Sequence, residues 1–277
     1  MSKGREDLFA ELKILADTLI KGIEPSERSA TLTEQVVALM SLKIANHTCG
    51  AVHLLTSGFY PESIILLRSA YECLVMSKYL QQKPEEIPRY EAHGGLCNLR
   101  NMLEFQMKTD FDAETKDGLT AQIEDLKKAL CQSVIAFYPD LQPADLDNFA
   151  KVRKASNKAL FSQLPSMLTA TQWTDDDDWI KNSFELYNIG SQVTHSQMEW
   201  LAIGEYGKSE HAIYSRLAVS SYLVMFLNEI SQTLATLGLC SKPNRDAFES
   251  QYEVCANLIM VWLTEEQTNM DKRIANR

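Results

Sequence analysis

Residues 187 to 197, YNIGSQVTHSQ, hold the side chains of this sequence that are best placed to do chemistry together. Tyr187, Ser191 and His195 follow one another at intervals of four residues, and in an α-helix this spacing puts them on one face. A histidine can act as a general acid or base, and a serine and a tyrosine can orient it by hydrogen bonds. The spacing predicts a polar stripe, which is a solvated face, a hydrogen-bonded strut or part of a reaction centre.

A second polar pair interrupts an apolar helix earlier in the chain. Arg68 and Glu72 lie four residues apart within SIILLRSAYECLVMSKYL, a stretch that is apolar nearly all round and is therefore expected at the centre of the fold. An unpaired buried charge costs several kcal/mol, so each of the two needs a partner. They satisfy one another only in part, because arginine has further donors to place. We expect this pair to meet the stripe that begins at Tyr187.

Two interpretations of this meeting point stay open. In the first it is a ligand or catalytic pocket, with candidate catalytic residues Arg68, Glu72 and His195 and candidate binding residues Tyr187, Asn188 and Ser191. In the second it is a structural network that fixes the register of two helices. Gly190 predicts close approach of a neighbouring helix or a ligand, because glycine costs about 1 kcal/mol relative to alanine inside a helix.

Helical periodicity positions these residues, and it runs through nearly the whole chain. The expected helices cover about 8–22, 33–57, 61–82, 85–108, 112–137, 175–203, 210–237 and 243–267, with short helices and loops in an irregular segment at 139–173. Thr33 is expected to cap the second helix, Gly94 and Gly95 to soften the fourth, and Thr174 to cap a helix whose first turn holds four aspartates. The sequence predicts an all-α, single-domain bundle of about eight helices over residues 1–277, in which residues 1–30 form an N-terminal helix and linker.

Composition limits the partners. The 277 residues carry a formal net charge of −10, which argues against broad adhesion to DNA or anionic membranes. The segment KVRKASNK, residues 151–158, is the main basic patch, and it is either a solvated helix face or a phosphate-contacting edge beside an RNA site. The most apolar stretch, residues 217–227, runs into Asn228 and Glu229, so it predicts a buried helix and no membrane span.

Other common chemistries find little support. No signal peptide and no CxxC pair are present, so we expect a cytoplasmic protein with six reduced, mostly buried cysteines. The sequence has no ExxH pair, and His47 and His53 point about 120° apart on a helix, so neither a metal nor another cofactor is expected. GxSxG, P-loop and GxGxxG motifs are also missing. Ser191 and His195 project from one helix with no visible oxyanion hole, which disfavours acyl transfer.

Two resemblances add to these residues. LLTSGFYPESI, LLRSAYECLVMSKYL and YNIGSQVTH resemble, over about residues 35–235, a family of uncharacterised bacterial all-helical proteins with a Leu-Leu-Arg-Ser…Glu segment and a Tyr-x-x-x-Ser-x-x-x-His segment. The chain is more distantly similar to the HEPN superfamily, which includes RNA-cleaving toxins and phage-defence effectors that use an Arg and a His without metal. The nearest local match to that pair is RYEAH, Arg89 to His93, one residue short of the usual gap.

These observations lead to competing expectations for function. One is a defence or toxin effector acting on RNA or a nucleotide, in which Arg68 stabilises phosphate charge and His195 is the general acid or base. Another is a non-enzymatic binding or scaffold module in which the same network is structural. Small-ligand sensing in the pocket is a third. A bundle with this many apolar faces is also compatible with a homodimer.

Overall fold

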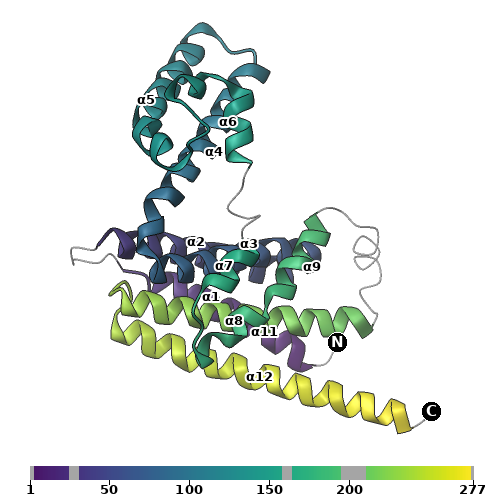
Figure 1. The fold of residues 1–277 in the computed structure, drawn as a ribbon. Coiled ribbons are helices and arrows are strands. Elements are labelled where there is room, and N and C mark those ends of the chain that lie inside the picture. The colour runs from purple at the N-terminus through teal and green to yellow at the C-terminus, as the bar shows by residue number, and fades with distance from the viewer. Residues whose placement is uncertain (1–2, 25–30, 158–163, 195–209, 276–277) are drawn as a thin grey trace. The chain divides into compact units, whose positions relative to one another are not determined.

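The computed structural model describes residues 3–24, 31–157, 164–194 and 210–275, and most of them lie in helices (Figure 1). The helices are α1 (Lys3–Lys21), α2 (Leu32–Thr56), α3 (Tyr60–Gln82), η1 (Pro84–Glu86), α4 (Ile87–Lys108), α5 (Ala113–Phe137), η2 (Pro143–Asp147), α6 (Phe149–Ser156), α7 (Leu164–Ala170), η4 (Asp175–Asp177), α8 (Asp178–Asn182), α9 (Phe184–Thr194), α11 (Glu210–Thr236) and α12 (Lys242–Ala275). Within these residues the β pairing is limited to one isolated antiparallel bridge between Ile23 and Cys240. The all-α class is confirmed, with more helices than the eight or so that were predicted.

The chain divides into two compact units. Unit 1 is built from Met1–Lys78 and Trp173–Arg277, and unit 2 is the contiguous stretch Tyr79–Gln172 between them. The chain leaves unit 1 within the last turn of α3 and returns just before η4. A single folding domain over residues 1–277 stays a prediction.

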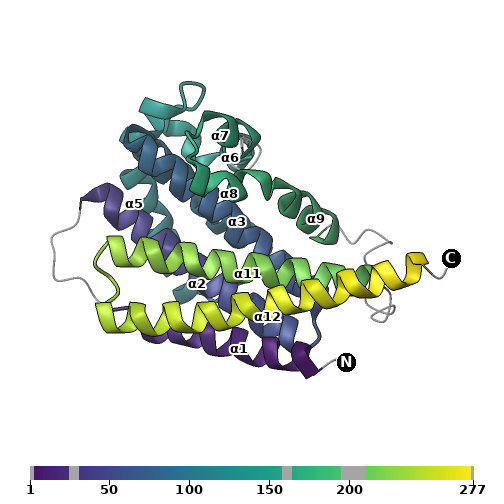
Figure 2. The same cartoon turned by 90° about the horizontal axis from the view of Figure 1, so that it is seen from below.

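Unit 1 is a bundle of long helices. Figure 2 shows α1, α11 and α12 running alongside one another, and α2 packs against both α1 and α11. The leucine stripe of α1 predicted by the sequence, at positions 8, 12, 15 and 19, is buried in this bundle. The end of α1 is tied to the α11–α12 turn, because the Glu24 backbone N–H donates to the Leu239 carbonyl at 2.8 Å. Burial of these apolar faces is the main favourable contribution to the stability of unit 1.

Residues 60–78 of the helix α3 belong to unit 1, and many of their side chains are buried, as the sequence predicts. Tyr71 is fully buried and stacks on Phe226 of α11, with ring centroids 6.4 Å apart. Its hydroxyl donates to the carbonyl of Ile180 in α8 at 3.0 Å. A buried tyrosine hydroxyl normally needs such a partner, because an unmade hydrogen bond in the core is costly. Tyr71 therefore fixes α3 against two other helices of the unit.

Three local predictions are wrong. Thr31, and not Thr33, caps α2, because Thr31 and Glu34 form a reciprocal capping box that Thr33 has no partner to make. The helix expected over 175–203 breaks after Asn182, where the Ser183 hydroxyl and N–H both turn back to the Trp179 carbonyl. Residues 195–203 of that expected helix lie outside the described residues.

The helix α4 runs unbroken through Gly94 and Gly95, so the expected soft point is the third error. A Cβ added at Gly95 would clash with the Leu130 side chain of α5. The second glycine therefore permits close packing of α4 on α5 and does not interrupt the helix.

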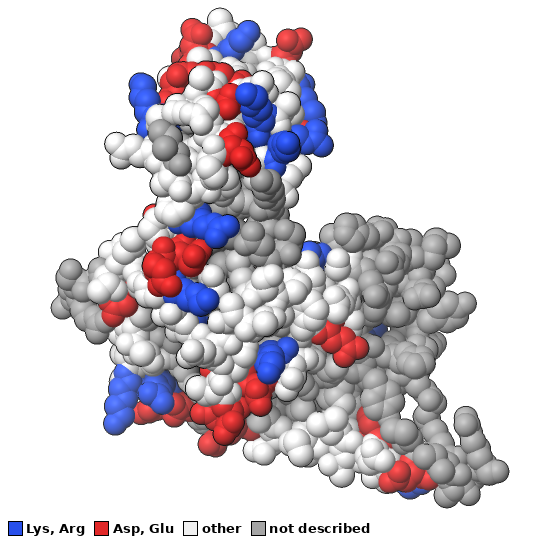
Figure 3. Space-filling view, viewed as in Figure 1, with Lys and Arg blue, Asp and Glu red and all other residues white. Residues whose placement is uncertain are grey.

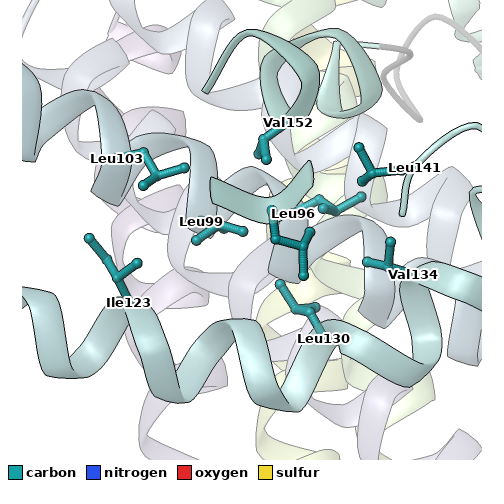
Figure 4. Close-up of a cluster of buried hydrophobic side chains, with 9 residues drawn as sticks. Leu96, Leu99, Leu103, Ile123, Leu130, Val134, Leu141 and Val152 are labelled. Atoms are coloured by element: carbon teal, nitrogen blue, oxygen red, sulfur yellow. The ribbon is translucent and has the colours of Figure 1, made fainter. Parts of the chain in front are cut away.

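Unit 2 has its own hydrophobic core. Figure 4 shows the side chains that α4, α5 and α6 contribute to it, among them Leu96, Leu99, Leu130, Val134 and Val152. Leu141 and Leu146, from the segment that the sequence predicts to be irregular, complete the cluster. That segment contains η2, α6 and α7, which agrees with the expected short helices and loops.

Two further properties follow from the described residues. No helix in this part of the chain is both long and apolar enough to cross a bilayer. All six cysteines are free thiols, of which Cys255 is buried and the other five are half-buried.

Candidate functional site

The predicted meeting of the two polar stripes occurs where α9 packs on α3 in unit 1. Arg68 and Glu72 form an ion pair on α3, with 2.9 Å between Nε and Oε1. The Arg68 side chain is 19% exposed and that of Glu72 12% exposed. The predicted partial burial of this pair is therefore confirmed.

Tyr187 of α9 supplies the second contact of Arg68. The guanidinium carbon lies 4.8 Å from the centre of the Tyr187 ring, within the range of a cation–π interaction. Phe184 stacks on the same tyrosine, with ring centroids 5.5 Å apart and planes 16° apart. The tyrosine ring is thus held from one side by its own helix, and the arginine lies over it.

Gly190 makes this approach possible. A Cβ added at this position would lie 2.6 Å from Cβ, 3.0 Å from Cδ and 3.1 Å from Cγ of Arg68. These distances are shorter than ordinary van der Waals contacts, so only glycine fits without movement of a helix or of the arginine. The close approach predicted from Gly190 is confirmed, and the neighbour is α3.

Burial shifts the pKa values of two acidic groups at this site. Burial raises the pKa of Glu72 above its ordinary value, and the Arg68 guanidinium and Lys43 of α2 pull it back only in part. Burial likewise raises the pKa of the neighbouring Cys73 thiol, which accepts a hydrogen bond from Lys43. Lys43 could not be predicted from the sequence, because nothing in the local pattern of α2 indicates which element its side chain faces.

The other predicted site residues are not all brought together. Ser191 is half-buried and lies one turn beyond Tyr187, adjacent to Gly190. Asn188 is exposed, so it lies away from the face of α9 that packs on Arg68. His195 lies outside the described residues. The described site therefore consists of Arg68, Glu72 and Tyr187, with Ser191 at its edge.

A second cluster in unit 1 was missed by the sequence analysis. Lys78 of α3 forms ion pairs with Asp177 of η4 and Glu229 of α11, each with 2.7 Å between nitrogen and oxygen. The three side chains are between 14% and 19% exposed. Asp177 also accepts hydrogen bonds from Thr174, so the predicted capping role of the aspartate run holds for this residue.

The Lys78 cluster is held in its charged form. Burial alone would lower the pKa of Lys78, but hydrogen bonds to Asp177 and Glu229 outweigh it and raise that pKa. Burial would raise the pKa of Asp177, but the hydrogen bonds from Lys78 and Thr174 lower it. Both shifts indicate an ion-paired network that joins three segments of unit 1.

A third group of polar residues lines a cavity in unit 2. The cavity has a volume of about 610 Å³ and is bounded by the N-terminal half of α4, the segment after α5 and the helix α6. Its walls include Arg89 and His93 of the RYEAH sequence together with Lys151 and Lys154 of the KVRKASNK sequence. Two motifs that the sequence presented separately therefore share one cavity.

His93 is the buried polar group of this cavity, with 6% of its surface exposed. Its Nδ1 lies 3.0 Å from the Tyr138 hydroxyl and its Nε2 lies 3.4 Å from the Cys97 sulfur. Burial lowers the pKa of His93, and the nearby Arg100 and Arg89 lower it further. The imidazole is therefore neutral at pH 7, with both ring nitrogens engaged.

We expect His93 to titrate below the ordinary histidine value of about 6.5. Because the unfolded chain binds a proton that folded His93 does not, the free energy of unfolding should fall as the pH drops below that value. NMR titration of the imidazole, assigned with His93→Gln, measures the pKa. Denaturant unfolding above and below this pH range should show a smaller loss of the free energy of unfolding in the variant than in the wild type. Part of the remaining loss is due to His47, whose pKa is also lowered by burial. A His93 pKa at or above the ordinary value would contradict this assignment.

Among the described residues, no group of three or more His, Cys, Asp or Glu side chains is placed to hold a metal ion. The candidate sites described above consist of cations, carboxylates and aromatic side chains, with His93 and Cys97 added at the unit 2 cavity. Their chemistry is that of ion pairing, hydrogen bonding and stacking.

Comparison with known families decides where the chain belongs. Residues 34–210 match the model of a family of unknown function, DUF5677. The chain is a member of the DUF5677 family. The match includes α3, α9 and all of unit 2, so the DUF5677 region contains both the Arg68 site and the unit 2 cavity. The resemblance to an uncharacterised all-helical family is thereby confirmed, over a range that ends earlier than the predicted residue 235. No curated protein and no solved structure matches the chain.

Proposed function

We propose that this DUF5677 protein is a helical effector of the bacterial defence or toxin type that acts on RNA or a nucleotide. In this proposal Arg68 binds the phosphate. The supporting observation is that the guanidinium is positioned by Glu72 at 2.9 Å and by the Tyr187 ring at 4.8 Å, while the side chain keeps 19% of its surface exposed. An arginine that is already ordered loses little further entropy when it binds a phosphate, and its planar fork suits that group.

The remaining residues take supporting roles in this proposal. Tyr187 and Ser191 orient the reacting groups from α9, and Glu72 holds the arginine through Nε. His195 is the proposed general acid or base, on the basis of its spacing in the sequence, since it lies outside the described residues. Arginine acts here by electrostatic stabilisation of the charge that develops on phosphate.

A second candidate function is favoured by the Gly190 contact. Arg68 packs its stem on Gly190 and its guanidinium on Tyr187, so it also fixes the register of α9 on α3. A structural network of this kind would belong to a non-enzymatic binding or scaffold module. The two candidates differ in what the loss of Arg68 should change.

The test compares RNA integrity and growth on expression of the wild type, Arg68→Lys, Arg68→Gln and His195→Ala. The effector proposal expects RNA loss and growth arrest with the wild type, reduced by about 100-fold or more in Arg68→Gln and His195→Ala. Arg68→Lys should recover little activity, because lysine keeps the charge but lacks the planar fork. Arg245→Gln is the matched control, since Arg245 is half exposed and pairs with Glu249 on the surface of α12.

Thermal unfolding of the same variants separates the two candidates. If the wild type leaves RNA intact and cells growing and binds no nucleotide, the effector proposal fails. If Arg68→Gln lowers the unfolding temperature and leaves every measured function intact, the structural network is the correct reading.

A further inference from the structure

The cavity of unit 2 combines a basic rim with a buried polar wall. Arg89, Lys151 and Lys154 line it together with one carboxylate, Asp140. Lys151 is engaged by Asp145 at 2.6 Å, whereas Lys154 makes no ion pair within the described part of the chain. Arg89 pairs only loosely with Glu86, at 3.5 Å. Among the residues that line the cavity three cations accompany one carboxylate, and two of these cations, Arg89 and Lys154, are weakly held.

The basic side chains cover only a small part of the visible face of unit 2. Figure 3 shows acidic and basic side chains interspersed over the visible face of the part that carries α4, α5 and α6, with several basic side chains gathered at one edge. The chain as a whole has a net charge of −10. An extended nucleic-acid backbone requires a basic stripe or patch. A small anion that fits one cavity requires only a few converging cations.

The chemistry of the rim favours phosphate among small anions. Arginine offers a planar fork of donors that matches phosphate oxygens, and lysine adds a point charge. Arg89 lies on α4 and Lys154 on α6, so they approach the same cavity from different helices. A phosphate between them would accept hydrogen bonds from two directions.

The other walls suit a planar ring. Phe137, Tyr138, Pro139 and Leu141 line the same cavity and provide aromatic and apolar surface next to the cations. Aromatic side chains stack on nucleobases without a strong preference for sequence. The volume of about 610 Å³ lies within the range of about 300–1,000 Å³ that is usual for small-molecule and cofactor sites.

We propose that the unit 2 cavity binds a mononucleotide, with Arg89 and Lys154 on the phosphate and the aromatic wall at Phe137 and Tyr138 against the base. His93 closes the buried side of the cavity through its contacts with Tyr138 and Cys97. Because both of its ring nitrogens are engaged, it is a positioning residue that holds Tyr138. This site is separate from the proposed Arg68 site and does not depend on it.

The experiment is isothermal titration of the full chain with four nucleoside monophosphates, with adenosine and with inorganic phosphate. We expect at least one monophosphate to bind at a site that Arg68→Gln leaves intact, about tenfold or more tighter than adenosine or phosphate alone. Arg89→Gln and Lys154→Gln should each weaken that binding by about tenfold or more, because each removes a charge-assisted hydrogen bond. Both side chains are exposed, so the unfolding temperatures of the two variants should equal that of the wild type.

Lys128→Gln is the matched control, since Lys128 of α5 is exposed and does not line the cavity. This variant should bind the nucleotide as tightly as the wild type does. The proposal is overturned if no monophosphate binds with a Kd below about 1 mM, which is already very weak binding. It is also overturned if the Arg89→Gln and Lys154→Gln variants bind as the wild type does. Binding of an RNA oligomer in place of monophosphates, or loss of nucleotide binding in Arg68→Gln alone, would likewise reject a mononucleotide site in unit 2.

Discussion

Replacing Lys78 by methionine should lower the free energy of unfolding by about 3 kcal/mol, the usual cost of breaking a buried ion pair from one side. Within the described part of the chain, the substitution removes the cation that pairs with two carboxylates, on Asp177 and Glu229, each 14% exposed. Two carboxylates would then share a mostly buried site without a counter-charge, which is costly. Denaturant unfolding at neutral pH measures the loss.

The matched control is Lys108→Met. Lys108 pairs with Glu104 at 2.5 Å on the surface of α4, with the lysine side chain 70% exposed. Exposed pairs contribute about 0–1 kcal/mol, so this variant should stay close to the wild type. If Lys78→Met were no more destabilising than Lys108→Met, the Lys78 cluster would have no special role in the stability of unit 1.

The loss in Lys78→Met should also depend on pH. The folded-state pKa of Asp177 is lowered, so its contribution is present above the ordinary aspartate value of about 3.9 and disappears as the pH falls through the folded-state value. The pKa of Lys78 is raised, so its contribution is lost only as the pH rises through that raised value. The stability difference between wild type and variant should therefore be constant near neutral pH and shrink in acid.

Gly190→Ala should destabilise the protein, although alanine is the better helix former. The added Cβ would lie 2.6 Å from the Cβ of Arg68, an atom that cannot move without its backbone, so α9 must shift on α3. Overpacking of this kind costs about 1–3 kcal/mol and outweighs a gain in helix propensity of about 1 kcal/mol. Urea unfolding measures the net change.

Gly94→Ala gives the comparison that isolates the packing effect. Gly94 is exposed within α4, and a Cβ added there would meet nothing within 4 Å. The same substitution should therefore raise the free energy of unfolding by about 0.5–1 kcal/mol. Opposite signs for the two variants are expected. A stabilising Gly190→Ala would mean that α9 does not pack on Arg68 in solution.

The parts of the site that the sequence predicts are the polar groups that interrupt an apolar helix. The one contact that it predicts between helices, Arg68 with Tyr187, follows from the need of these groups for a partner. Arg68 and Glu72 lie at a spacing that brings side chains together on any α-helix, and Gly190 stands out because a helix interior disfavours glycine. The exposure of Asn188 was not predicted, because α9 is apolar on more than one side and only the packing on α3 decides which face is buried. The break at Ser183 depends on a local side-chain hydrogen bond that competes with the helix.

The parts that the sequence did not predict are two further sets of contacts between distant segments. Lys78 and Glu229 each follow an apolar run in separate helices, and no periodicity relates one helix to the other. The unit 2 cavity is similar: Arg89 and His93 share a helix face, but Tyr138 and Lys154 reach them from two later segments. Such pairings are set by the topology of the fold, which a single sequence does not state.

The Lys78–Asp177 ion pair has a topological consequence. Unit 2 begins at residue 79 and ends at residue 172, so the pair joins the points where the chain leaves unit 1 and returns to it. Unit 2 is in effect a long insertion in unit 1, and an ion pair joins the residues that flank it. Because the entropy of closing a flexible loop grows only with the logarithm of its length, about 0.6 kcal/mol per doubling, unit 1 should tolerate replacement of unit 2 by flexible linkers of very different length while the Lys78–Asp177 pair is kept.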